Sequence, residues 1–147
     1  MKKSEVEEFI ARVVPEKDML CLVTFKPYKE MLNIDGYTNI LTKRGHRWKK
    51  VGCVITLNRK TFSTNNIAKQ QAIVLHEIGH YFTRSCRDSV REFKAQQWAI
   101  QQAQEMELYD VVSTLKEDLN SWVNCGWNSK NRRYKSAYNI AKENKMI

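Results

Sequence analysis

Two histidines four residues apart, with a glutamate after the first, are the residues of this sequence best suited to chemistry. They are His76, Glu77 and His80, in the stretch AIVLHEIGHYF at 72–82. On a helix, residues four apart share a face one turn from each other, so both imidazoles can point at one metal ion. Glu77 beside them is placed to activate a bound water. The spacing therefore predicts a Zn2+ site with Glu77 as catalytic base, although two histidines can also share a helix by chance.

A catalytic zinc site needs a third protein ligand and one open position for water. The remaining histidine, His46, lies far upstream in a basic turn and is a poor candidate. Downstream, Cys86 stands where the longer pattern HExxHxxGxxH has its third histidine, but Thr83 replaces the glycine of that pattern. Asp88 is a second candidate and could instead begin the next helix. The third candidate, Glu92, is the one that the sequence favours.

Glu92 stands at the head of a stripe of small residues on a predicted helix. Three alanines follow it at helical spacing: Ala95, Ala99 and Ala103. They would let two helices pack closely, and Gly79 on the histidine helix would allow the same close approach. A carboxylate buried on such a face is costly unless it is neutralised, which a zinc ion between the helices would do. The predicted ligands are therefore His76, His80 and Glu92; alternatively, Glu92 forms a capping box with Ser89.

Hydrophobic periodicity predicts an α+β fold around these residues. Short apolar stretches rich in β-formers predict strands at 19–25, 36–42 and 51–57. A period of 3.6 residues predicts helices at 5–14, 66–83, 89–107, 108–123 and about 134–141. An asparagine at 65 or 66 could cap the helix that carries the histidines. We expect a small, about three-stranded, antiparallel or mixed sheet, a zincin-like active-site helix and a helical C-terminal half.

The length and the charge suggest one domain with a basic surface. A chain of 147 residues can bury a core of its own, so a single zincin-like domain is expected over 1–147. The formal charge of +9 is concentrated in segments 43–60 and 130–145, and a basic helix or tail is expected at about 127–147. Such segments attract polyanions or acidic partners, although a solvated surface is the simpler interpretation.

Aromatic side chains among the basic residues suggest an alternative function. These are Trp48, Trp127, Tyr134 and Tyr138, which could stack on bases or belong to the core. The alternative is a basic module that binds nucleic acid or protein and retains a zincin-like fold, with or without proteolysis. The sequence leaves the oligomeric state open.

The four cysteines lie more than 30 residues apart and contain no CxxC pair, which disfavours a zinc ribbon. Glutamates at the N-terminus occupy the place where a signal peptide has its apolar region. No apolar run approaches the length of a membrane span, which is about 18 residues or more. We therefore expect a cytoplasmic protein with free thiols and no membrane partner.

The segments VITLN, QQAIVLHEIGHYF and EFKAQQWA together resemble the ImmA/IrrE family of zinc metallopeptidases. The shared pattern is a strand, the HExxH helix and a helix of the form E-x-x-A-x-x-aromatic-Ala, over roughly residues 52–103. The resemblance implies zinc held by His76, His80 and Glu92, with Glu77 as general base. It also implies a cytosolic endopeptidase that often cleaves a repressor or regulator and is commonly encoded by phage or mobile elements. The LLMP-like segment that commonly follows in the family is missing here, and the basic C-terminal region has no counterpart.

In peptide hydrolysis at this predicted zinc site, Glu77 would take a proton from the attacking water and return it to the leaving amine. An extended protein or peptide substrate could pair with the edge of the sheet. Tyr81, Tyr109 and Tyr134 are all candidates for stabilising the oxyanion, and the sequence does not choose among them. Peptide deformylases use HExxH with an upstream cysteine ligand, for which Cys53 is available, but its flanking residues differ from theirs.

Overall fold

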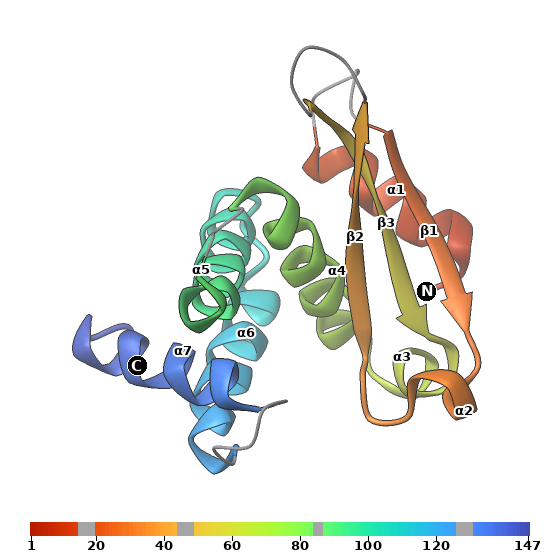
Figure 1. The fold of residues 1–147 in the computed structure, drawn as a ribbon. Helices are drawn as coiled ribbons and strands as arrows, with labels where there is room; N and C mark the ends of the chain where they lie inside the picture. Colours follow the sequence, from red (N-terminus) through yellow and green to blue (C-terminus); the bar gives the residue numbers. More distant parts are fainter. Residues whose placement is uncertain (15–19, 44–48, 84–86, 126–130) are drawn as a thin grey trace. The chain divides into compact units, whose positions relative to one another are not determined.

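The computed structural model describes residues 1–14, 20–43, 49–83, 87–125 and 131–147 (Figure 1). These residues form two compact units, Met1–Glu77 and Ile78–Ile147. The first holds a small sheet with helices and the second is helical, so the α+β class is confirmed. That the whole chain acts as one domain stays a prediction.

The sheet of the first unit is mixed. Its strands are β1 (Leu20–Lys26), β2 (Gly36–Lys43) and β3 (Lys49–Asn58), in the order β1-β3-β2. β1 runs parallel to the central strand β3, and β2 runs antiparallel to it. The three strands were predicted within about two residues of these bounds. Of the two arrangements that the sequence allowed, the mixed sheet is correct.

Helix α1 (Lys3–Val13) covers part of this sheet and contacts β1. Its buried residues are those of the predicted apolar stripe: Val6, Phe9, Ile10 and Val13. Burial of such a stripe against a sheet is the main source of a short helix's stability. Alternate residues of β3 complete the core, with Cys53, Ile55 and Leu57 fully buried.

Two short helices were not predicted. They are α2 (Tyr28–Met31) and α3 (Arg59–Thr64), and each is too short to show a 3.6-residue period. The buried side chain of Asn58 caps the start of α3 and also binds the segment that follows α2. Its Oδ1 accepts from the Thr61 amide at 3.4 Å, and its Nδ2 donates to the carbonyls of Leu32 and Ile34 at 2.9 and 3.0 Å.

Helix α4 (Ile67–Phe82) carries the predicted histidines. The Asn66 side chain accepts from the Lys69 amide at 2.8 Å, which confirms the predicted cap at the start of the helix. Val74, Leu75 and Ile78 are fully buried, as the apolar stripe predicts. The helix passes without a break from the first unit into the second, since the boundary falls between Glu77 and Ile78.

The second unit is built on helix α5 (Asp88–Glu105), against which α6 (Tyr109–Ser121) and α7 (Arg132–Glu143) pack. A 3-10 turn, η1 (Trp122–Asn124), follows α6. The Gln96 side chain, 1% exposed, donates to the Leu115 carbonyl at 2.8 Å and ties α5 to α6. The three helices confirm the predicted helical C-terminal half.

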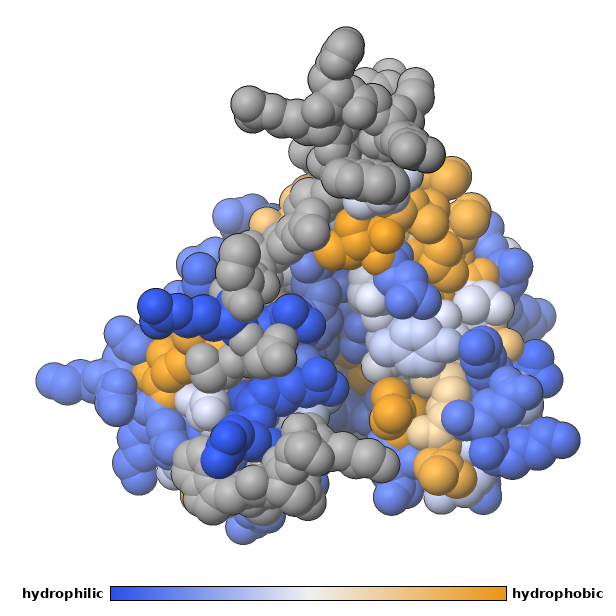
Figure 2. Space-filling model, viewed as in Figure 1, coloured by the Kyte–Doolittle hydropathy of each residue, from blue (hydrophilic) through white to orange (hydrophobic). Residues whose placement is uncertain are grey.

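On the face that Figure 2 shows, most of the coloured surface is hydrophilic and hydrophobic residues are exposed in patches. On β1, Leu20 and Leu22 are 51% and 47% exposed, because they lie on the face of the strand opposite to the buried Val23. In the described ranges, none of the helices has both the length and the apolar composition that crossing a bilayer requires.

Candidate metal centre

Three of the predicted residues come together in one group. One ligand atom each of His76, His80 and Glu92 lies within 4.8 Å of the others, so the group could hold a metal ion. Because α4 is unbroken, the helix itself sets the two imidazoles one turn apart on the same face. Two imidazoles and a carboxylate are a donor set that zinc accepts in hydrolases, with one position left for water. The donor chemistry therefore fits zinc, although other divalent metals also bind imidazole and carboxylate.

Glu92 is buried, and its two carboxylate oxygens lie close to nitrogen atoms of two other side chains. Only 3% of its side chain is exposed. Its Oε2 lies 3.2 Å from Nε2 of His80, and its Oε1 lies 3.3 Å from Nε of Arg133 on α7. Leaving such a carboxylate unpaired would be costly, and these contacts offset that cost. The sequence argument that a buried Glu92 must be neutralised is thus supported, but the cation in contact here is an arginine.

Gly79 allows α5 to approach the last turn of α4. A Cβ placed on Gly79 would lie 2.5 Å from the carbonyl oxygen of Ala95, which is closer than real side chains come. The three alanines of the predicted stripe are fully buried: Ala95, Ala99 and Ala103. The predicted close packing of small residues is confirmed, and it brings the head of α5 next to His80.

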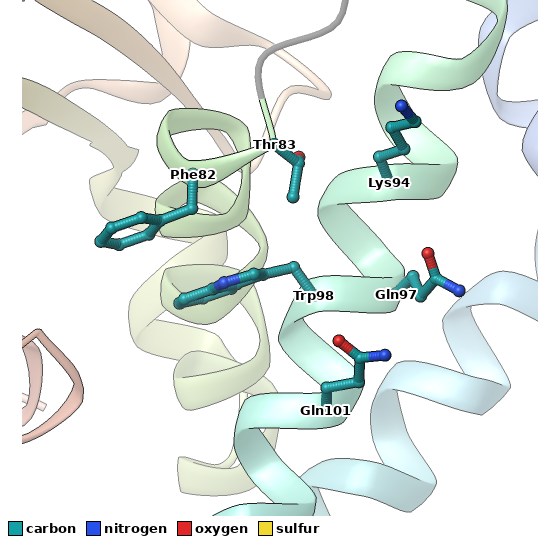
Figure 3. A pocket seen from close by; sticks show the side chains of 6 residues that line it. All are labelled: Phe82, Thr83, Lys94, Gln97, Trp98 and Gln101. Carbon is teal, nitrogen blue, oxygen red and sulfur yellow. The ribbon is translucent and has the colours of Figure 1, made fainter. Parts of the chain in front are cut away.

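An aromatic contact holds the same two helices together one turn further on. The rings of Phe82 and Trp98 are stacked, with centroids 5.1 Å apart and planes at 14° (Figure 3). A hollow of about 290 Å³ opens beside this pair. Its lining residues are Phe82, Thr83, Lys94, Gln97, Trp98 and Gln101. The stacked pair and the Gly79 contact both join α4 to α5, the helix that carries Glu92.

The sequence left open a capping role for Glu92 and other residues as the third ligand. Helix α5 begins at Asp88 with Arg87 as its N-cap, so Ser89 is inside the helix and Glu92 is not three residues after the cap. The capping box expected as an alternative is therefore wrong. Cys86 lies outside the described residues, and so does the side chain of Asp88. Cys53, the deformylase-like alternative, is not in the metal-capable group found among the described residues.

Glu77 has different surroundings, on the sheet side of α4. Its side chain is 6% exposed. The Thr38 hydroxyl on β2 lies 2.7 Å from Oε2 of Glu77 and 2.9 Å from its backbone carbonyl oxygen, and its single proton can serve one of them at a time. A Cβ on Gly36 would lie 3.5 Å from Cγ of Glu77, so β2 runs directly against this side chain. A neutral hydroxyl therefore orients Glu77.

Two thiols face each other in the same sheet. Cys21 on β1 and Cys53 on β3 are direct partners in the parallel register, with their sulfurs 3.6 Å apart. The hydrogen bond between them lowers the pKa of Cys21 and, together with burial and the nearby Glu77 charge, raises the pKa of Cys53. Both are free thiols, as expected from the sequence.

The sequence argument missed two residues that contact the site. Arg133 had a detectable signal: it precedes Ala137 and Ala141 by one and two turns, so it heads a small-residue stripe just as Glu92 does. Both of these alanines are fully buried. Thr38 had no such signal, because strand alternation does not tell which residue of an edge strand meets a neighbouring helix.

The remaining predicted residues are spread through the structure. Tyr81 is buried and packs edge-on against Phe82, whereas Tyr109 is 65% exposed at the start of α6. Tyr134 packs edge-on against Trp122 at 5.0 Å, and the Lys142 ammonium lies 5.8 Å from the Tyr138 ring. These contacts choose no oxyanion stabiliser, which stays a prediction.

The nucleic-acid interpretation also stays a prediction. His46, Trp48 and Trp127 lie outside the described residues, as do the side chains at 43–51. Tyr134 is one of the aromatic residues that could stack on bases, and its ring packs against Trp122 in an edge-to-face contact. Known proteins add nothing to these observations: no family model matches the chain, and neither a curated protein nor a solved structure does.

Proposed function

We propose that this protein is a zinc-dependent metallopeptidase that hydrolyses a peptide bond in a protein substrate. The observation that carries the proposal is the convergence of His76, His80 and Glu92, whose ligand atoms lie within 4.8 Å of one another. Helical spacing predicts the two histidines, and the alanine stripe on α5 predicts Glu92. Their convergence from two different helices supports the zincin-like interpretation of the HExxH pattern.

His76, His80 and Glu92 would bind the metal. When bound there, zinc would acidify a water molecule and polarise a substrate carbonyl. The role of the protein in that reaction is to hold two imidazoles and one carboxylate at fixed positions. The helix sets the histidines, while the close α4–α5 packing at Gly79 and the buried position of Glu92 set the carboxylate.

Glu77 would act as the general base. Thr38 donates to Oε2 and so leaves Oε1 to accept the proton of the attacking water. The same carboxyl group then delivers that proton to the leaving amine. The contact at Oε2 is with a neutral hydroxyl and not with a cation. This environment suits proton transfer.

The edge strand β2 is the proposed docking site for an extended segment of the substrate. In the sheet that the described residues form, β2 pairs with β3 along one edge only. Strand addition would supply main-chain hydrogen bonds without demanding a particular side chain. Since β2 carries Thr38, a segment paired there would pass close to Glu77. A repressor or other regulatory protein is the substrate class that the family resemblance implies.

Metal content tests the ligand set. Purified full-length protein should hold about one zinc per chain, as expected for a mononuclear site of three protein ligands. Glu92→Ala should lose the metal, whereas Cys86→Ala should retain it. Atomic absorption on dialysed samples, with circular dichroism to verify folding, measures both. Loss of zinc in the cysteine variant alone would replace Glu92 with Cys86 as third ligand, and a metal-free wild type that also rejects added zinc would overturn the proposal.

Peptide cleavage tests the activity. The zinc-loaded protein should cut members of a mixture of unstructured peptides, detected as new termini by mass spectrometry. A chelator should stop cleavage, and added Zn2+ should restore it. Cleavage that continues unchanged after the metal has been removed would contradict a metallopeptidase.

A further inference from the structure

Arg133 on the basic C-terminal helix reaches the third proposed ligand. Its Nε lies 3.3 Å from Oε1 of Glu92, on the side of the carboxylate away from Oε2 and His80. The helix that carries it, α7, packs against α5 through the buried Ala137 and Ala141. The two charged residues thus stand at the heads of two small-residue stripes on neighbouring helices.

We propose that Arg133 is a positioning residue for the metal site, which holds Glu92 so that one oxygen faces the histidines. This inference rests on the proposed zinc site. The last torsion of a glutamate is broad and allows the carboxylate to rotate freely. The ion pair brings Nε of Arg133 within hydrogen-bonding distance of Oε1, and such a charge-assisted contact restricts that rotation and leaves Oε2 as the metal-facing oxygen. Arg133 therefore favours a monodentate ligand and an open position for water.

Further contacts keep the guanidinium in place. Its central carbon lies 5.2 Å from the centroid of the Tyr134 ring, and that ring packs against Trp122 of η1 at 5.0 Å. Arg133 is nevertheless 44% exposed, while Glu92 is 3% exposed. The arginine can thus be replaced without opening the core, which makes it a practical target for substitution.

The charge of Arg133 and its hydrogen bond have opposite effects on metal binding. A nearby guanidinium repels a divalent cation, whereas the hydrogen bond orients the ligand that the cation needs. Glu92 pairs with Arg133 closely enough for the orienting effect to act directly on the ligand. If orientation dominates, removing the side chain weakens metal binding. If repulsion dominates, removal strengthens it.

Three substitutions separate these effects. Arg133→Met removes the charge and the hydrogen bond, Arg133→Gln keeps a donor without the charge, and Arg133→Lys keeps the charge without the planar fork. The neighbouring Arg132 is exposed and has no contact with Glu92 in the described structure, so Arg132→Met is the matched control for net charge.

The measurement is Zn2+ affinity of the full-length protein, by competition with a chromophoric chelator. Arg133→Met should bind zinc about 10- to 100-fold more weakly than wild type, the usual effect of losing a hydrogen bond to a metal ligand. Arg133→Gln should recover part of that loss, and Arg132→Met should match wild type. Equal or tighter binding by Arg133→Met would overturn the positioning role.

A spectroscopic measurement distinguishes positioning from general damage. With Co2+ in place of zinc, a change of Glu92 from one coordinating oxygen to two raises the coordination number and weakens the visible absorption bands. We expect weaker bands for Arg133→Met and recovery in Arg133→Gln; an unchanged spectrum in both would contradict the proposal.

If Arg133→Met fails to fold, Arg133→Gln and Arg133→Lys decide by the same two measurements. A wild type that binds neither metal would refute the zinc site itself, which is a different outcome.

Discussion

Glu77 and Glu92 are both buried carboxylates, yet their surroundings differ. Glu77 belongs to the sheet-containing unit, where the Thr38 hydroxyl meets its Oε2 at 2.7 Å. Glu92 belongs to the helical unit, where its two oxygens meet an imidazole nitrogen at 3.2 Å and a guanidinium nitrogen at 3.3 Å. One carboxylate thus has a neutral partner on one oxygen, and the other is held on both oxygens by groups that carry or can carry positive charge.

This difference indicates a division of chemical roles. A group that must accept and release a proton works best when no fixed cation stabilises its anion. A group that must remain a metal ligand works best as a permanently oriented anion. The surroundings of the two glutamates match these requirements in the proposed assignment, Glu77 as base and Glu92 as ligand. The predictions below alter one set of surroundings at a time.

The largest expected effect comes from Glu77→Gln. The amide keeps an oxygen that can accept from Thr38 but cannot take up a proton. We expect kcat/KM for peptide cleavage to fall by about 10²- to 10⁴-fold, with zinc content unchanged. Glu92→Gln should instead lose both metal and activity. Zinc loss in Glu77→Gln, or near-normal activity in it, would remove the distinction between the two carboxylates.

Gly79→Ala should disturb the surroundings of Glu92 and leave those of Glu77 intact. The added Cβ would lie 2.5 Å from the Ala95 carbonyl oxygen, a backbone atom that cannot rotate away. Overpacking of this kind costs about 1–3 kcal/mol, which exceeds the gain of up to about 1 kcal/mol from better helix propensity. We expect a lower free energy of unfolding in urea and weaker zinc binding. A more stable variant with normal zinc affinity would show that close packing at Gly79 does not position Glu92.

Thr38→Val acts on the opposite side, on the surroundings of Glu77. The shape is kept and the hydroxyl is lost, so a buried carboxylate loses its partner at a cost of about 1–3 kcal/mol. We expect a lower free energy of unfolding and reduced kcat, with zinc affinity unchanged. Thr24→Val makes the same replacement on the other edge strand, β1, and should leave both quantities near wild type. Normal activity in Thr38→Val would mean that the hydroxyl does not orient the base.

The grouping of the three proposed ligands was predictable from sequence because these residues follow helical spacing. His76 and His80 lie one turn apart, and Glu92 heads an alanine stripe whose burial could be anticipated. Arg133 obeys the same rule, because it heads the stripe of Ala137 and Ala141 at helical spacing. Local periodicity, applied to every stripe with a charged head, would have found it.

Contacts between strands could not be predicted in the same way. Which strand lies beside which, and in what direction, depends on pairing between residues far apart in the chain. The sequence indicated three strands but not that β1 is parallel to β3 or that β2 meets Glu77. Thr38 and the facing thiols, Cys21 and Cys53, therefore became visible only in the structure.

The smallest expected effect concerns these thiols, which belong to the surroundings of Glu77. The hydrogen bond with Cys53 holds the pKa of Cys21 below its ordinary value of 9.0, although burial acts in the opposite direction. Burial raises the pKa of Cys125 instead. Since only the thiolate reacts with iodoacetamide, Cys21 should be alkylated faster than Cys125 below pH 9.0.

Cys53→Ala removes the hydrogen-bond partner of Cys21 and should raise the pKa of Cys21. The pH profile of Cys21 alkylation, followed by mass spectrometry of its peptide, should then move to higher pH. The rate should fall severalfold below pH 9.0 and approach that of wild type at higher pH, where Cys21 is ionised in both proteins. Alkylation of Cys125 in the same sample is the internal control and should not change. An unmoved Cys21 profile would show that the two sulfurs, 3.6 Å apart, do not share a proton in solution. The pairing of β1 with β3 at these two residues would then be looser in solution than in the structure.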